Sequence, residues 1–170
     1  MQTQSESSAI RPSFPVGILR QDGRFHVLAG ASIPEGSRIM NLIGQESDQA
    51  SRYSVQVAWQ RHVETWVPLQ GDASLDSCQV RYMNHSCQPN TRFVDRQVVA
   101  LRDIAAREEL TFDYNTTEWE MAEAFVCECG HCGGRRIAGF RHLLPAQREA
   151  CKDRLPPYLQ MRLTHSLPAE

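Results

Sequence analysis

The seven residues Asn84-His85-Ser86-Cys87-Gln88-Pro89-Asn90 carry more information about this chain than any other stretch of it. About twenty residues later the chain reads Glu109-Leu110-Thr111-Phe112-Asp113-Tyr114-Asn115. A third motif, Cys127-Glu128-Cys129-Gly130-His131-Cys132, follows soon after. Each motif alone is a modest signal, but their order along one chain makes the combination much more specific.

Composition limits the classes of protein to which this chain can belong. The 170 residues are 41% hydrophobic and 22% charged, which is typical of one globular domain with a core of useful size. A formal net charge of −2 and a pI near 6.3 provide no overall basic field, so we expect neither direct nucleic-acid binding nor membrane binding. No apolar run approaches the roughly 20 residues that cross a bilayer. The polar residues 1–12 indicate a disordered leader and no signal peptide, and a cytoplasmic location follows by default.

Periodicity predicts a mainly β fold made of many short strands. Alternating apolar residues indicate strands at 16–19, 25–28, 39–43, 53–57 and 63–67, and a hairpin of strands 91–94 and 98–101. Two similar turn-and-strand units, at 31–40 and 101–110, form a weak internal echo. A helix is expected only at 146–155, ending at Pro156-Pro157, with a frayed tail beyond Met161.

The third motif indicates a metal site. Three cysteines within six residues are too close together for pairwise disulfides, whereas soft thiolates suit zinc. A structural zinc ion needs four ligands, and the adjacent pair His131 and Cys132 can seldom both reach one ion. The motif therefore predicts three zinc ligands, Cys127, Cys129 and Cys132, and the alternative is a loop of thiols that holds no metal. We interpret Cys78 and Cys151 as buried or incidental thiols.

In this order the three motifs resemble the SET domain, the fold of the S-adenosylmethionine-dependent lysine methyltransferases, together with its post-SET zinc loop. The resemblance extends over residues 16–144 and is strongest at 81–140, and residues 116–123 resemble the small stand-alone bacterial members. It implies short curved sheets with a pseudoknot. It also implies the divisions 13–115 (SET domain), 116–144 (post-SET region) and 145–170 (C-terminal helix and tail), after the leader at 1–12.

The resemblance also implies one zinc ion with Cys87 as its fourth ligand, because in that family the cysteine of the Asn-His-Ser-Cys stretch completes the site. The family usually spaces the loop cysteines as Cys-x-Cys-x4-Cys, whereas this chain has Cys-x-Cys-x2-Cys. The flanking residues 133–140 resemble the family's usual exit from this loop. Cys87 would thereby join the zinc loop to the active site.

Further residues take roles by the same resemblance. Tyr114 would act at the methyl-transfer centre, and Asn84 and His85 would hold S-adenosylmethionine. The cofactor-binding set is Asn84, His85, Tyr53, Arg24 and Phe25. Phe112 would line the substrate channel and leave room for more than one methyl group, and Arg81 would be structural. The family's Gly-x-Gly loop is replaced here by Asp22-Gly23-Arg24-Phe25-His26, and Arg107 stands where a turn glycine is usual.

These implications favour an S-adenosylmethionine-dependent N-methyltransferase that acts on a protein or peptide lysine. Two alternatives remain open. One is a methyltransferase for small-molecule or peptide amines, because the segment between Tyr53 and Arg81 is short for an extended peptide groove. The other is a catalytically inactive SET-fold binding module, which the single glycine of the cofactor loop keeps open. The sequence does not determine the substrate or the oligomeric state.

Overall fold

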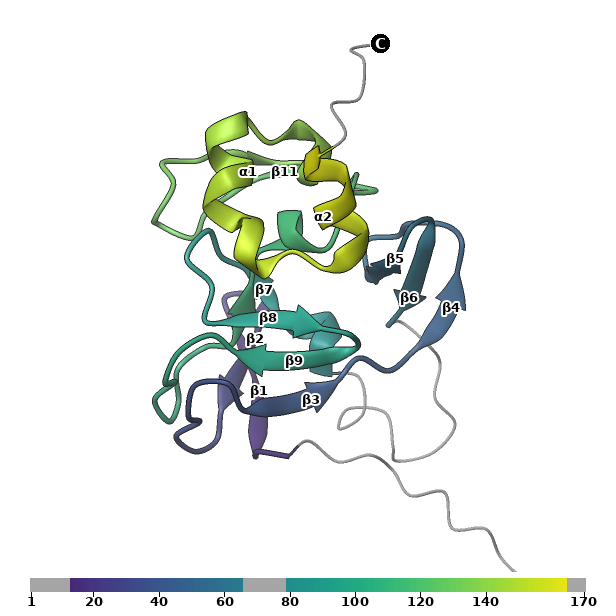
Figure 1. Ribbon diagram of the computed structural model, residues 1–170. Coiled ribbons are helices and arrows are strands. Elements are labelled where there is room, and N and C mark those ends of the chain that lie inside the picture. Colours follow the sequence, from purple (N-terminus) through teal and green to yellow (C-terminus); the bar gives the residue numbers. More distant parts are fainter. Residues whose placement is uncertain (1–12, 66–78, 165–170) are drawn as a thin grey trace, which may run out of the picture.

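Short strands build most of the fold. The computed structural model describes residues 13–65 and 79–164, and twelve strands lie within these ranges (Figure 1). They are β1 (Val16–Gln21), β2 (Arg24–Ala29), β3 (Arg38–Asn41), β4 (Gln45–Ser47), β5 (Ser54–Ala58), β6 (Arg61–Glu64), β7 (Asn84–His85), β8 (Thr91–Val94), β9 (Gln97–Ala100), β10 (Thr111–Phe112), β11 (Phe125–Val126) and β12 (Arg136–Ile137). The predicted mainly β class is confirmed. The leader at 1–12, Cys78 and the end of the strand expected at 63–67 lie outside the described residues.

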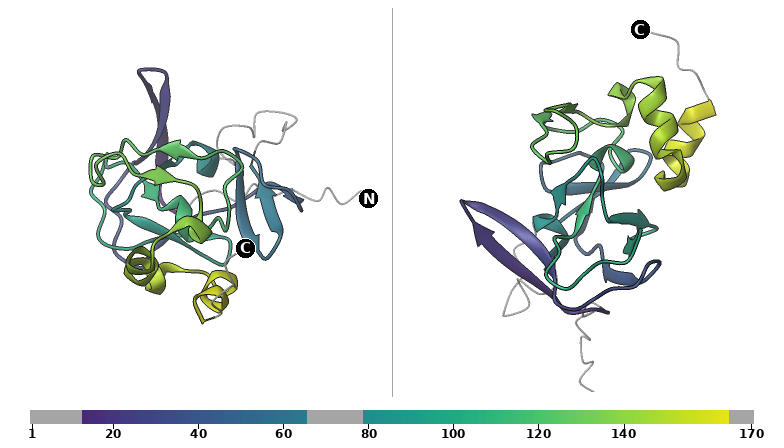
Figure 2. Two further views of the ribbon diagram at one scale, coloured as in Figure 1. Left: turned by 90° about the horizontal axis from the view of Figure 1, so that it is seen from above. Right: turned by 90° about the vertical axis from the view of Figure 1, so that its left-hand side faces the viewer.

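The strands form five small sheets. Strand orders are β1–β2, β3–β9–β8, β4–β6–β5, β11–β12 and β10–β7. The β1–β2 turn has positive φ at both Asp22 (50°) and Gly23 (79°), which is the turn geometry that matches the twist of a hairpin. This hairpin projects from the rest of the molecule (Figure 2). The predicted turn at 21–24 is therefore present, and Gly23 serves its geometry.

The two turn-and-strand units of the internal echo lie side by side. Ile33 and Ile104 each donate a backbone hydrogen bond of 2.9 Å to the other's carbonyl, and both are 1% exposed. Gly36 and Arg107 occupy matching turns at φ of 76° and 69°. The turn therefore keeps its left-handed conformation even though Arg107 replaces the usual glycine. The main core forms around this contact and consists of Val27, Ala29, Ile33, Ile39, Met40, Leu42, Val55, Val63, Val80, Met83, Val98, Ala100, Ile104, Leu110 and Phe112.

One parallel strand pair brings the first two sequence motifs together. In β7 and β10, Asn84 pairs with Thr111 and His85 pairs with Phe112. Parallel neighbours need a long connection, and here the antiparallel strands β8 and β9 lie in that connection. This pairing of β7 with β10, called the crossing below, corresponds to the pseudoknot that the resemblance implies. It places the amide and imidazole of one motif beside the aromatic residues of the other.

Helical structure is concentrated at one end of the molecule, opposite the β1–β2 hairpin (Figures 1 and 2). It consists of α1 (Pro145–Cys151), the 3-10 turn η4 (Lys152–Arg154) and α2 (Pro157–Thr164). Three further 3-10 turns are η1 (Gln79–Tyr82), η2 (Tyr114–Thr116) and η3 (Phe140–His142). A second, smaller core packs α1 and α2 against η3 and consists of Phe140, Leu143, Cys151, Leu155, Tyr158 and Leu159. None of the helices within 13–65 and 79–164 is long and apolar enough to cross a membrane.

The predicted single helix at 146–155 is wrong in its extent. The α-helix ends at Cys151, and a second helix, α2, begins at Pro157 and ends at Thr164, so it includes the first residues of the part predicted to fray. The rest of that part, 165–170, lies outside the described residues. Proline ends a helix that precedes it but is favoured at the first position of a new one, where its missing N–H would have no partner. Burial of Tyr158 and Leu159 stabilises this second helix. The expectation that Cys151 is a buried thiol is confirmed.

Candidate active site and metal centre

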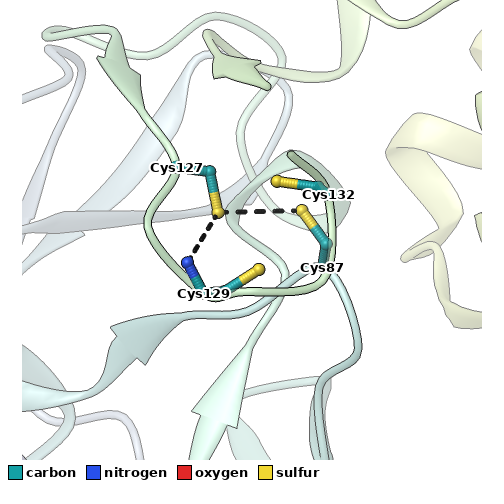
Figure 3. A group of neighbouring side chains, drawn as sticks. All are labelled: Cys87, Cys127, Cys129 and Cys132. Atoms are coloured by element: carbon teal, nitrogen blue, oxygen red, sulfur yellow. Dashed lines mark hydrogen bonds between the residues drawn. The ribbon is translucent and has the colours of Figure 1, made fainter. Parts of the chain in front are cut away.

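Four cysteine sulfurs gather in one place. The ligand atoms of Cys87, Cys127, Cys129 and Cys132 all lie within 4.8 Å of one another, and the side chains point toward a common centre (Figure 3). The Sγ atoms of Cys87 and Cys127 are 3.8 Å apart. Cys87 comes from the segment after β7, forty residues before Cys127. The structure thus brings the predicted fourth thiol to the other three, and His131 is not part of the cluster.

The distances fit a zinc ion. Zinc–sulfur bonds of about 2.3 Å in a tetrahedron place neighbouring sulfurs about 3.8 Å apart. Burial raises the pKa of Cys87 well above its usual value, with hydrogen bonds from Cys132 and Cys127 adding to the rise. Such a thiol gives up its proton when a divalent cation supplies compensating charge. The donor set, its spacing and its charge requirement all match a structural Zn²⁺.

The short loop spacing is accommodated by glycine. The loop is the connection of the β11–β12 hairpin, where the backbone N–H of Cys127 donates to the carbonyl of Arg135 over 2.8 Å. Gly130 and Gly133 adopt positive φ of 79° and 65°, a conformation that other residues avoid. Two residues fewer than the usual spacing therefore still allow all three thiols to face inward.

His85 connects the cysteine cluster to Tyr114. Its Nδ1 accepts a hydrogen bond of 3.2 Å from the backbone N–H of Tyr114, so the ring proton of the neutral imidazole lies on Nε2. This Nε2 is 3.3 Å from Sγ of Cys87. Burial lowers the pKa of His85, which favours the neutral ring. The imidazole is thus committed to Tyr114 and Cys87, and only the backbone of His85 remains for a bound ligand.

Tyr114 has its hydroxyl fixed by the crossing. The phenol donates a 2.7 Å hydrogen bond to the carbonyl of Met83, immediately before β7. Its ring contacts His85, Phe112 and Phe125 at centroid distances of 5.3, 4.7 and 5.9 Å. Burial raises the pKa of the phenol above its usual range, so Tyr114 is neutral at physiological pH. The side chain therefore offers an oxygen lone pair without the reactivity of a phenolate.

Phe112 packs behind Tyr114. It is 5% exposed, and its ring lies 4.7 Å from that of Tyr114 and 5.0 Å from that of Phe93. As a phenylalanine it donates no hydrogen bond near the Tyr114 hydroxyl.

Asn84 links the crossing to the β1–β2 hairpin. Its Nδ2 donates to the carbonyl of Phe25 and to Oε1 of Glu109, both over 2.7 Å. The same carboxylate oxygen is 2.9 Å from Nδ1 of His26. Both amide hydrogens of Asn84 are therefore used inside the protein, and its Oδ1 is the atom available to a ligand. Glu109 and His26 are site residues that the motif analysis does not single out.

A row of aromatic and arginine side chains joins the remaining cofactor candidates. The ring of Phe25 lies 4.7 Å from that of Tyr82, and the Arg81 guanidinium lies 4.7 Å from the Tyr82 ring and 5.9 Å from the Tyr53 ring. Phe25 and Tyr53 are 40% and 41% exposed, which leaves their faces open. Tyr82 was missed by sequence reasoning, although its place two residues before Asn84 is a usable signal. Arg81, interpreted from sequence as structural, lies between the two aromatic rings.

Arg24 lies apart from Phe25. Alternate residues of a strand face opposite sides, and the Arg24 guanidinium pairs with the carboxylate of Glu128 in the cysteine loop. With Gln21, Asp22 and His26, Arg24 lines an open depression of about 450 Å³. The pair is exposed and thus contributes little stability, but it brings β2 against the loop that holds the thiols.

Comparison with known proteins agrees with this geometry. The family model "SET domain" matches residues 24–115. A Candida albicans protein named histone-lysine N-methyltransferase, H3 lysine-36 specific, is 30% identical over 71% of the chain and 17% of its own length. A Kluyveromyces lactis protein of the same name is 38% identical over 44% of the chain and 12% of its own length. The chain thus spans less than a fifth of these two relatives.

A solved structure has the same fold. KRYPTONITE, crystallised with mCHG DNA and SAH, aligns with a TM-score of 0.54 at 23% identity and covers 74% of this chain and 29% of its own. The parallel crossing of β7 and β10, the half-buried Tyr114 and the matched region of 92 residues lead to one conclusion. The chain belongs to the SET-domain family.

Proposed function

We propose that this protein is an S-adenosylmethionine-dependent N-methyltransferase whose substrate is a protein lysine. The observation that carries the proposal is the neutral Tyr114 hydroxyl, held by the Met83 carbonyl at the crossing where Oδ1 of Asn84 makes no hydrogen bond to residues 13–65 or 79–164. The names of the relatives, histone-lysine N-methyltransferases, support the reaction and the substrate class.

The residues that would hold the cofactor are the backbone of His85, Oδ1 of Asn84, the exposed rings of Phe25 and Tyr53, and the half-buried ring of Tyr82. Aromatic faces suit a purine ring, and an amide oxygen suits an ammonium group. Arg24 stays a proposed cofactor residue on the side of β2 that faces the cysteine loop. S-adenosylmethionine supplies an electrophilic methyl group in this site.

Transfer of that methyl group would be an in-line displacement: a carbon–nitrogen bond forms as the carbon–sulfur bond breaks and the sulfonium leaves as a thioether, so the amine must be neutral and aligned. The Tyr114 hydroxyl donates a hydrogen bond to the Met83 carbonyl, so the lone pairs of its oxygen can accept a hydrogen bond from the amine and align it. Because burial keeps the phenol protonated, Tyr114 does not compete as a nucleophile. The apolar rings of Phe112 and Phe125 on either side favour the uncharged form of the amine.

Zinc has a structural role in this proposal, and residues 116–144 act as a post-SET region. One ion held by the four cysteines would fix Cys87, and through His85 it would fix the backbone of Tyr114. Phe112, which donates no hydrogen bond beside Tyr114, supports the addition of more than one methyl group. The cytoplasmic location stays a prediction from the sequence.

Two measurements test the proposal. Calorimetry should show binding of S-adenosylmethionine, and no binding would leave only a binding module. Purified protein with methyl-labelled cofactor should then label lysine in lysate proteins. Label that appears only in small metabolites would favour the alternative, a methyltransferase for small amines. Mass spectrometry of the labelled peptide counts the methyl groups.

The Tyr114→Phe variant tests the central residue. It removes the hydroxyl and keeps the ring packing, so we expect turnover to fall by about 10²-fold or more while cofactor affinity changes little. Turnover equal to that of the unmodified protein would remove Tyr114 from the mechanism.

A further inference from the structure

Glu118 lies four residues after Tyr114 and is buried between the β4–β6–β5 sheet and α2. Its backbone N–H donates to the Tyr114 carbonyl over 3.0 Å. Its Oε1 accepts from the backbone N–H of Gln56 in β5 over 2.7 Å. The side chain is 9% exposed. One residue thus joins the segment that carries Tyr114 to strand β5.

The second oxygen of this carboxyl faces an imidazole nitrogen. Oε2 of Glu118 is 3.7 Å from Nδ1 of His62 on β6, and the His62 side chain is 8% exposed. Within the described ranges, Nδ1 has no hydrogen-bond partner. A buried polar atom without a hydrogen-bond partner costs free energy. If the distance between Oε2 and Nδ1 shortened slightly, one proton between the two atoms would give each of them a hydrogen bond.

The hydroxyl groups near the carboxyl do not supply that proton. Oγ1 of Thr117 lies 3.4 Å from Oε1 of Glu118, the oxygen that accepts from Gln56, whereas Oε2 faces His62. The Tyr158 hydroxyl of α2 lies 2.7 Å from the Gln56 carbonyl and 2.8 Å from the Thr117 carbonyl, so it donates to backbone. Its pKa is raised by burial, and it therefore stays neutral. Arg162, the charged residue of α2, lies over the Trp59 ring at 3.8 Å.

Burial also determines which of the two partners carries the proton. It raises the pKa of Glu118 to about 7 and lowers the pKa of His62. An uncharged acid beside an uncharged imidazole avoids the desolvation of a buried ion pair.

We propose that Glu118 is a positioning residue for Tyr114, and that it holds this place as a carboxylic acid that shares a single proton with His62. The positioning part rests on the proposed methyl transfer. The shared proton does not, because it concerns the folded protein alone.

Proton counting makes this arrangement testable. In the unfolded chain the ordinary pKa values are 4.5 for Glu118 and 6.5 for His62, so between these pH values one proton resides on the histidine. In the folded protein one proton resides on the glutamic acid. Folding then moves the proton from His62 to Glu118 without net proton uptake. This pair therefore contributes no pH dependence to the free energy of unfolding between about pH 4.5 and 6.5.

Single substitutions break that balance in opposite directions. Glu118→Gln keeps an acceptor for Gln56 and gains an N–H for His62, but it leaves only His62 to titrate. Its stability is full above the ordinary pKa of the histidine and is lost as pH falls through 6.5. His62→Asn leaves only Glu118 to titrate. The folding stability of this variant is full below pH 4.5 and is lost as pH rises toward 7. Each unfolding equilibrium constant should change by up to about tenfold per pH unit.

The experiment is urea unfolding of the whole chain from pH 4.5 to 7.5. Glu123→Gln is the matched control, because Glu123 lies in the same segment, its side chain is 65% exposed, and its ion-pair partner is Arg52 rather than a histidine. The proposal expects opposite slopes for the two single variants relative to the control, and a control-like profile for the double variant. Equal or same-sign slopes would overturn the shared proton.

Methyl transfer tests the positioning role. Glu118→Ala should lower turnover more than cofactor affinity, and Glu118→Gln should restore turnover. Turnover in Glu118→Ala equal to that of the unmodified protein would overturn the role, and if this variant fails to fold, the Gln variant decides by its turnover at neutral pH. If the unmodified protein transfers no methyl group, the proposed function and the positioning role both fail, whereas the slopes still decide the shared proton.

Discussion

Replacement of Cys87 by serine tests whether this distant thiol completes the metal site. Structural zinc sites with four ligands bind with about 10–16 kcal/mol, so one ligand of four accounts for roughly 3 kcal/mol. Serine keeps the size of the side chain but does not offer an anionic sulfur at neutral pH. We therefore expect zinc affinity to fall by about two orders of magnitude in Cys87→Ser.

The matched control is Cys151→Ser. Cys151 is buried whereas Cys87 is half-buried; its thiol lies 3.4 Å from the carbonyl of Arg148, and it is not part of the four-sulfur cluster. A serine hydroxyl can donate to the same carbonyl, so zinc binding should be unchanged in this variant. The assay is competition for zinc with a coloured chelator, followed by elemental analysis of the purified proteins.

Thermal unfolding provides a second readout of the same variants. Zinc binding is linked to folding, so Cys87→Ser should unfold at a lower temperature, and added zinc should restore less of the loss than it does in Cys151→Ser. Equal zinc affinity and equal unfolding temperature in Cys87→Ser and the unmodified protein would refute Cys87 as a ligand.

Three further predictions concern the fold. Leu159→Ala should lower the free energy of unfolding, measured in urea, by about 2–5 kcal/mol, because Leu159 is fully buried. Met161→Ala is the control and should change stability far less, because Met161 is 61% exposed. Equal effects of the two substitutions would contradict the packing of α2. Arg107→Gly should raise the unfolding temperature, because a non-glycine residue in the left-handed conformation costs about 1–2 kcal/mol. The greater conformational entropy of glycine in the unfolded chain offsets roughly half of this gain in stability. A lower unfolding temperature would contradict this account. A hydrogen bond from Arg102 lowers the pKa of Glu108 to about 2. The ionised carboxylate therefore stabilises the fold above the ordinary pKa of 4.5, and this stabilisation is lost as pH falls toward 2. Glu108→Gln should lose less stability than the unmodified protein in an acid titration, and an identical pH profile would contradict this prediction.

Much of the candidate site could be predicted from short motifs. The identities and spacing of the loop cysteines indicate zinc, because few ions prefer clustered thiolates. The order of the three motifs indicates the family, and the proposed role of Tyr114 comes from the resemblance to that family. Alternation of apolar residues predicts the strands, since a half-buried strand must repeat every two residues.

Other features could not be predicted, because they depend on which segments meet. Glu118 stands in a polar stretch of sequence, where a solvated side chain is the ordinary expectation. Its burial follows from packing of β5, β6 and α2 around it. Pro156-Pro157 likewise allows either an end or a beginning of a helix, and the apolar contacts of Leu159 select the second.

The sequence by itself determined the chemistry of this protein: the thiols, the asparagine and histidine of the first motif, and the tyrosine that follows β10. The tertiary structure alone decided how these groups are held. It turned the Asn84 amide inward to Phe25 and Glu109, made the His85 ring a link between Tyr114 and Cys87, and placed Tyr82 among the candidate cofactor residues. The physical reason is that a motif specifies which donors and acceptors exist, whereas the partner of each is selected by the strand pairing and burial of the whole chain.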